Sequence, residues 1–190
     1  MEWTTWSWNK YKSEVDSFAK SLISIDFQPR DVVNIIGFNA PEWNISDFGT
    51  IAAGGISAGI YATNNADACK YISIHSKAKV IVLDGNKQLE KYAVIASELS
   101  DLKAIVFYGT ETINEEFKSK ISVPVYTFKE FQELGNDVSD DDLKARIEPQ
   151  KPNQICTLIY TSGTTGKIKL IYLDEIALLT NFKKKVILRL

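Results

Sequence analysis

Apolar positions along this chain follow two alternating patterns. One has helical spacing, as in residues 11–23, where apolar side chains recur on one face and charged residues occupy the others. The other is a compact run rich in β-branched residues, as in 32–38, which suits a buried strand. Helices are predicted at 11–23, 41–53, 66–76 and 87–99. Strands are predicted at 32–38, 80–83, 104–108, 123–128 and 155–160.

The order of these elements determines the expected fold class. Short apolar strands that alternate with helices are typical of a parallel sheet covered by helices on both faces. We therefore predict an α/β protein with a mostly parallel sheet flanked by helices. The pattern leaves the order of the strands open.

A long uncharged run at 48–66 has the length of a membrane span. It contains four glycines and several hydroxyl and amide side chains, so it is better interpreted as a buried helix that ends at Gly54-Gly55 and leads into a short strand. The N-terminus lacks the basic and apolar regions of a secretory signal. We expect a cytoplasmic protein without a transmembrane segment, and peripheral association with intracellular membranes stays an alternative.

Composition and charge narrow the class of protein further. The chain has 190 residues, 45% of them hydrophobic, which is enough to bury a globular core and excludes disordered and coiled-coil classes. A net charge of −2 gives no reason to expect a nucleic-acid partner. The acidic run at 137–142 lacks the spacing of a calcium loop and suits a helix N-terminus, so no metal site is predicted.

One segment, directly after the last predicted strand, has a composition that indicates chemistry: residues 160–167 read YTSGTTGK. Its hydroxyls, glycines and backbone N–H groups can surround one anion, and Lys167 and Lys169 add positive charge, so we predict a phosphate-holding loop. It is not a Walker A loop, because Thr161 and Ile168 stand where that motif needs Gly and Ser or Thr. The Gly-rich segment 54–59 follows a helix rather than a strand and does not fit a dinucleotide fingerprint.

The loop closely resembles the phosphate-loop signature of the adenylate-forming (AMP-binding) superfamily. Upstream, GFNAPEW (37–43) and AGGISAGIY (53–61) resemble long-chain acyl-CoA synthetases, and the second segment is especially similar to the bubblegum type. The resemblance covers about residues 3–167. It implies the N-terminal part of the large domain of an adenylate-forming enzyme, and a ligase that acts on long-chain fatty acids.

Enzymes of this family activate a fatty acid with ATP and magnesium, and CoA then displaces AMP to form a thioester. The resemblance therefore implies ATP and Mg as cofactors, with a long-chain fatty acid and CoA as substrates. It also assigns the binding of the ATP phosphates to seven residues. These are Thr161, Ser162, Gly163, Thr164, Thr165, Gly166 and Lys169. No catalytic residue is assigned, because the family's later segments have no counterpart here.

The resemblance ends soon after the loop. Ile168 and Leu170 stand where the family has Pro and Gly, and residues 161–190 carry a net charge of +4 against −6 for the preceding residues. We therefore predict an incomplete AMP-binding domain at 1–167 and a divergent basic tail at 168–190. The chain is expected to be a ligase fragment that is inactive alone.

Two alternatives to a ligase fragment stay open at this point. One is a non-catalytic, truncated module that binds nucleotide or regulates a partner. The other is an unrelated anion-binding α/β domain, which the lack of a strand directly before Thr161 would favour.

Overall fold

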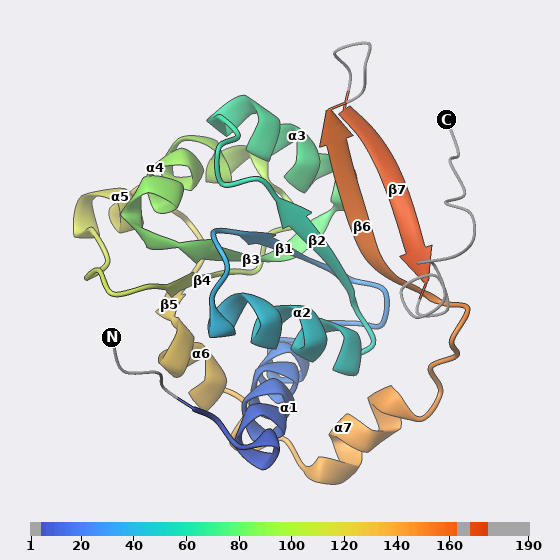
Figure 1. The fold of residues 1–190 in the computed structure, drawn as a ribbon. Helices are drawn as coiled ribbons and strands as arrows, with labels where there is room; N and C mark the ends of the chain where they lie inside the picture. Colours follow the sequence, from blue (N-terminus) through green and yellow to red (C-terminus); the bar gives the residue numbers. More distant parts are fainter. Residues whose placement is uncertain (1–4, 163–167, 175–190) are drawn as a thin grey trace.

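A seven-stranded sheet runs through the middle of the molecule, in the order β5-β4-β3-β1-β2-β6-β7 (Figure 1). The structure is a computed structural model, and it describes residues 5–162 and 168–174. The strands are β1 (Val32–Ile36), β2 (Ile56–Ile60), β3 (Ala78–Asp84), β4 (Ala104–Tyr108), β5 (Val125–Thr127), β6 (Ile155–Ser162) and β7 (Ile168–Asp174). The helices are α1 (Trp8–Ser24), α2 (Pro41–Ala52), α3 (Ala66–Ser76), α4 (Gly85–Ile95), α5 (Glu115–Ser119), α6 (Phe128–Glu133) and α7 (Asp140–Ile147), with a short 3-10 turn η1 (Ala96–Glu98).

Pairing in the sheet is parallel from β5 through to β6. The central strand β1 has β2 on one side, with Val32 opposite Ile56, and β3 on the other. β6 pairs in parallel with β2, and β7 is antiparallel to β6. The predicted α/β class with a mostly parallel sheet is therefore confirmed.

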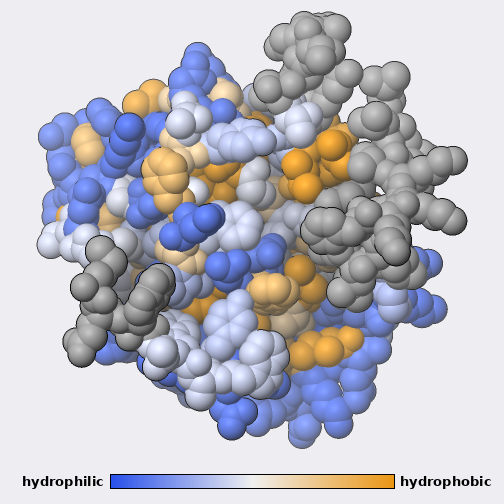
Figure 2. Space-filling model, viewed as in Figure 1, coloured by the Kyte–Doolittle hydropathy of each residue, from blue (hydrophilic) through white to orange (hydrophobic). Residues whose placement is uncertain are grey.

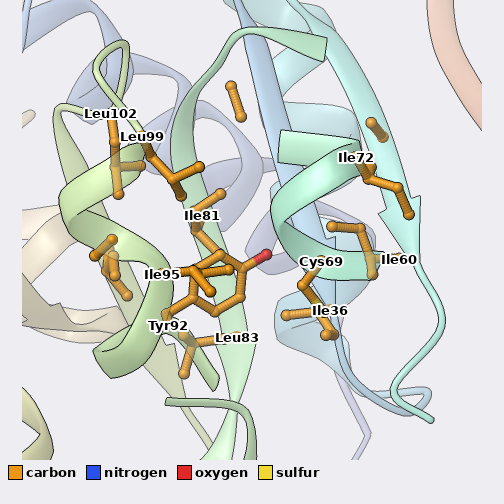
Figure 3. Close-up of a cluster of buried hydrophobic side chains, with 14 of the residues drawn as sticks. Ile36, Ile60, Cys69, Ile72, Ile81, Leu83, Tyr92, Ile95, Leu99 and Leu102 are labelled. Carbon is orange, nitrogen blue, oxygen red and sulfur yellow. The ribbon is translucent and has the colours of Figure 1, made fainter. Parts of the chain in front are cut away.

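Side chains that alternate along β1 form two separate cores. Val32 and Ile36 point to one face of the sheet, which α3, α4 and α5 cover, and Tyr92 of α4 is the largest fully buried side chain of that core (Figures 1 and 3). Val33 and Ile35 point to the opposite face, which α1, α2, α6 and α7 cover. All five β1 residues are buried because both faces are packed, as expected for a central parallel strand.

Local signals define where several helices begin. Proline occupies the first position of α2, where its missing N–H has no helical partner to lose. α6 and α7 each begin with a capping box, in which Thr127 pairs with Glu130 and Ser139 with Asp142. The acidic run at 137–142 therefore leads into the first turn of α7, which confirms the helix N-terminus predicted there.

The passage from α2 to β2 needs two glycines. Gly54 has φ +84°, a left-handed conformation that glycine adopts without strain. A β-carbon on Gly55 would lie 2.5 Å from the Phe27 ring, so only glycine fits against this buried aromatic residue. The uncharged run at 48–66 is thus a helix end and a strand, as predicted, and no helix in the described part of the chain is both long and apolar enough for a membrane span.

The structure differs from the predicted elements in three places. The predicted strand at 123–128 is shorter, because the Thr127 cap turns the chain into α6 at Phe128. α5 and α6 are only five and six residues long, too short for a helical period to be visible in the sequence. β7 follows the loop directly and extends the sheet beyond β6, where no strand was predicted.

Candidate functional site

The predicted phosphate loop begins within β6 and is followed by β7, and these two strands pair antiparallel. Thr161 pairs with Lys169, and Ser162 pairs with Ile168, in the antiparallel register of the two strands. The structure therefore brings the backbones of Thr161, Ser162 and Lys169 together. The other four predicted site residues, Gly163, Thr164, Thr165 and Gly166, lie outside the described residues, as does Lys167.

A strand leads directly into Thr161, so the condition that would have favoured an unrelated anion-binding domain is not met. Tyr160, the residue before Thr161, is buried with 4% of its surface exposed. His75 Nδ1 of α3 lies 3.0 Å from the Tyr160 hydroxyl, and the two rings meet edge to face. His75 thus contacts the strand that carries the loop.

A half-open cleft of about 540 Å³ lies beside this end of β6. The residues that follow β1, the residues that follow β2, and the last four residues of β6 before Thr161 all line it. It therefore lies at the carboxyl ends of parallel strands, where open α/β sheets bind their ligands. Figure 2 shows hydrophobic surface at the position of β6, where Ile159 is 37% exposed.

One face of α2 forms a wall of this cleft. Trp43, Asp47 and Ile51 all line it, and their spacing of four residues places them along one side of the helix. A β-carbon on Gly59 would lie 3.4 Å from Trp43 Cζ2, so glycine lets the indole lie close against β2. The cleft is therefore aromatic and apolar with one carboxyl group on its wall.

Asp47 belongs to a polar cluster between α2, β2 and β6. Ser57 Oγ donates to Thr157 Oγ1 at 3.1 Å, and Thr157 Oγ1 donates to the Ser57 carbonyl oxygen at 3.1 Å. Burial raises the pKa of the Asp47 carboxyl above its ordinary value, and a hydrogen bond with the Ser57 side chain counters part of that rise. The cluster connects the wall of the cleft to the strand that carries the loop.

Sequence reasoning missed this cluster. The spacing of Trp43 and Asp47 on α2 was a usable signal, because a carboxylate beside apolar residues on a core-facing helix needs a partner. The partners Ser57 and Thr157 are 100 residues apart and meet only because β2 and β6 are neighbours, which the sequence pattern left open.

No metal centre can be assigned within residues 5–162 and 168–174. This part of the chain contains no group of three or more His, Cys, Asp or Glu side chains close enough to hold a metal ion. The Mg that the family resemblance implies therefore has no cluster of three such side chains to bind it among the described residues.

The fold and the site together define the class: an α/β protein with a ligand cleft at the carboxyl ends of its parallel strands. Solved structures with this fold include the adenylation domain of a carboxylate reductase from Mycobacterium chelonae, with a TM-score of 0.79, 15% identity, and coverage of 97% of this chain and 30% of that one. The anthranilate CoA ligase AuaEII in complex with anthranoyl-AMP has a TM-score of 0.68, 20% identity, and coverage of 92% and 32%.

The chain belongs to the AMP-binding enzyme family, because the sequence model of that family matches residues 1–188. It is 43% identical over 174 residues to the long-chain-fatty-acid–CoA ligase ACSBG2 of Xenopus laevis, and 42% identical to ACSBG1 of Homo sapiens. Each alignment covers 92% of this chain and 23% of the relative, so the chain spans about a quarter of the length of these curated relatives. The predicted domain boundary at residue 167 stays a prediction.

Proposed function

We propose that this chain is the phosphate-holding N-terminal part of a long-chain fatty acid–CoA ligase. The observation that carries the proposal is the position of YTSGTTGK, which begins at the carboxyl end of β6 beside an apolar cleft, in a chain 43% identical to such a ligase. The proposed overall reaction joins a fatty-acid carboxylate to AMP with release of pyrophosphate, and then exchanges AMP for the thiol of CoA.

In this proposal the seven predicted loop residues hold the β- and γ-phosphates of ATP. The hydroxyls of Thr161, Ser162, Thr164 and Thr165, together with backbone N–H groups, donate hydrogen bonds to phosphate oxygens, and Gly163 and Gly166 allow the backbone to come close. Lys169 adds a positive charge. These groups stabilise the charge that develops on the leaving pyrophosphate while the carboxylate attacks the α-phosphorus.

Mg would accompany the nucleotide and neutralise phosphate charge. The described residues contain no group of three or more His, Cys, Asp or Glu side chains that could hold it, and no step of the proposal depends on a residue that coordinates it. Catalytic residues are likewise left unassigned. In this proposal the chain contributes phosphate binding and the shape of the cleft.

A second candidate function rests on the share of the relatives that the chain covers. A segment equal to 23% of a ligase can bind nucleotide without completing the reaction, and it would then act as a truncated nucleotide-binding or regulatory module. We accordingly expect the purified 190-residue chain to form no acyl-CoA. We also propose a cytoplasmic location, with peripheral contact to intracellular membranes as the alternative.

Titration with Mg-ATP tests the loop assignment. The fluorescence of Trp43, which lines the cleft beside the loop, should change on binding. Lys169→Ala should weaken binding by about tenfold, because a charge-assisted contact to phosphate is lost. Lys151→Ala is the matched control, since Lys151 is exposed and precedes the start of β6, at the end of the strand away from the loop, and it should stay within about twofold of the unmodified chain.

An activity assay separates the two candidate functions. ATP-, CoA- and palmitate-dependent thioester formation should be absent from the purified chain even where Mg-ATP binds. Robust thioester formation would overturn the expectation of inactivity. An unchanged fluorescence signal at millimolar Mg-ATP, confirmed by calorimetry, would overturn the loop assignment itself.

A further inference from the structure

A second cavity lies at the opposite end of the sheet from the phosphate loop. It has a volume of about 430 Å³ and is formed where β1, β2 and β6 begin, with the end of α7 along one side. Ile155 lines it and precedes Thr161 by six residues, so the two sites are about 20 Å apart along β6. A ligand in this cavity would not contact the loop.

Hydrogen bonds between distant segments hold the walls of this cavity. The Arg30 N–H donates to the Gly54 carbonyl oxygen at 2.9 Å, which joins the start of β1 to the start of β2. Gln150 Nε2 donates to the carbonyl oxygens of Ile51 at 2.8 Å and Arg146 at 3.0 Å, which ties the end of α7 to the end of α2. The cavity is therefore preformed.

Two arginines line the cavity, and one of them is incompletely bonded. Arg146 Nη1 is buried and has no hydrogen-bond partner within the described part of the chain. Neither Arg30 nor Arg146 forms an ion pair with any acidic residue of that part. A buried guanidinium donor without an acceptor is unfavourable, whereas carboxylates and phosphates satisfy it through strong charge-assisted hydrogen bonds.

Apolar side chains line much of the remaining wall. Pro29 precedes β1 and Ile56 begins β2, while Pro149 follows α7 and Ile155 begins β6. Ile155 is 43% exposed, a large value for an isoleucine on a strand. A half-buried arginine, Arg146, and an exposed one, Arg30, beside apolar surface match a ligand that has an anionic head and an apolar body.

We propose that this cavity binds a small organic anion. Its carboxylate or phosphate group would accept hydrogen bonds from Arg146 and Arg30, and its hydrocarbon part would lie against Ile56 and Ile155. A fatty-acid carboxylate and an alkyl phosphate share this chemistry. The proposal is independent of the function proposed for the loop, because none of the loop residues that the structure describes lines the cavity.

Calorimetry with four probes tests the ligand class. Octanoate and octyl phosphate carry an apolar chain, and acetate and inorganic phosphate are their short counterparts. Each long probe that binds should bind more than about tenfold tighter than its short counterpart, because several methylene groups leave water. Comparison of octanoate with octyl phosphate identifies the preferred head group. Equal affinities of long and short probes would overturn the proposal. The absence of binding by every probe at a concentration of roughly 10 mM would also overturn it.

Two variants on α7 test the role of the arginine. Arg146→Met preserves much of the side-chain length but removes the charge, and it should weaken binding of the long probe by about tenfold or more. Lys144→Met is the control, because Lys144 lies on the same helix, is exposed, and pairs with Glu148 at 3.6 Å. It should change binding by less than about twofold, since an exposed pair contributes little.

Readouts other than binding keep this test interpretable. Arg146→Met should leave the urea midpoint unchanged or raise it, because it removes an unpartnered buried donor. If it lowers stability instead, Arg30→Gln provides the same binding test at an exposed position. Mg-ATP binding should be unaffected in both variants, which distinguishes failure of this site from failure of the loop. Unchanged octanoate and octyl phosphate binding in both arginine variants would contradict the assignment.

Discussion

Thr157→Val is the most specific perturbation of the link between the cleft and the strand that carries the loop. Valine has nearly the same shape as threonine but can neither donate nor accept a hydrogen bond. The substitution removes the two contacts of 3.1 Å that join Thr157 to the Ser57 hydroxyl and to the Ser57 carbonyl oxygen. Packing is preserved, so the effect reports on the polar cluster.

The magnitude follows from these two contacts. Each intramolecular hydrogen bond contributes about 1 kcal/mol net to stability, and a buried group left without a partner adds to the loss. Ser57 is 1% exposed, so water does not replace the lost partner. Without Thr157 Oγ1, the Ser57 hydroxyl proton can instead be donated to the Asp47 carboxylate, which limits the loss. We expect the free energy of unfolding to fall by about 1–2 kcal/mol.

Urea unfolding followed by tryptophan fluorescence measures this change. With a urea dependence of about 2 kcal/mol per M, the midpoint should fall by about 0.5–1 M. Thr110→Val is the matched control, because Thr110 is exposed and no hydrogen bond involves its side chain within the described residues. It should stay within about 0.5 kcal/mol of the unmodified chain. A Thr157→Val midpoint equal to that of the control would refute the polar link between β2 and β6.

Three further predictions concern residues near the sites. Gly37→Ala should lower the free energy of unfolding by about 1–3 kcal/mol, because its β-carbon would lie 2.1 Å from the Tyr108 hydroxyl oxygen. Gly59→Ala, with its nearest neighbouring atom at 3.4 Å, should change it far less, and thermal unfolding of both variants checks the contrast. Asp47→Asn should be more stable than the unmodified chain at pH 7, and the difference should vanish below the ordinary pKa of 3.8. The raised pKa makes the folded state bind the proton more tightly, so stability falls as pH rises through that range; a difference that grows on acidification in urea titrations would contradict this. Burial raises the pKa of Cys69 to about 11, so iodoacetamide at pH 8 should label it far more slowly in the folded chain than in urea, and equal rates would contradict the buried environment.

Much of the fold could be predicted because local and global signals agree. The run 32–38 is apolar at four of the five positions that form β1, with the buried Asn34 as the exception, and β1 is buried on both faces. Pro41 and Gly54 mark the two ends of the α2 region through their backbone chemistry. By contrast, the start of α6 was not predicted. A Thr127–Glu130 capping box stabilises the first turn of this helix in a segment whose residues also favour a strand, and the spacing of apolar residues does not reveal such a cap.

The candidate site was predictable only in part. The composition of residues 160–167 was enough to predict anion binding from the sequence alone, because closely spaced glycines and hydroxyls suit phosphate oxygens. The cleft beside it depends on which strands are neighbours, since Asp47, Ser57 and Thr157 come from three elements. The cavity with Arg30 and Arg146 depends in the same way on the meeting of three strand starts with α7.

The central claim is that the segment after β6 holds the phosphates of ATP. Titration of the ¹⁵N-labelled chain with Mg-ATP, followed by amide chemical shifts, tests it most directly. The account predicts saturable chemical-shift changes centred on residues 160–169, with no changes at Arg30 or Arg146. In Lys169→Ala, the affinity for Mg-ATP obtained from these changes should be about tenfold weaker. Shifts confined to other parts of the chain, or none at millimolar Mg-ATP, would contradict it.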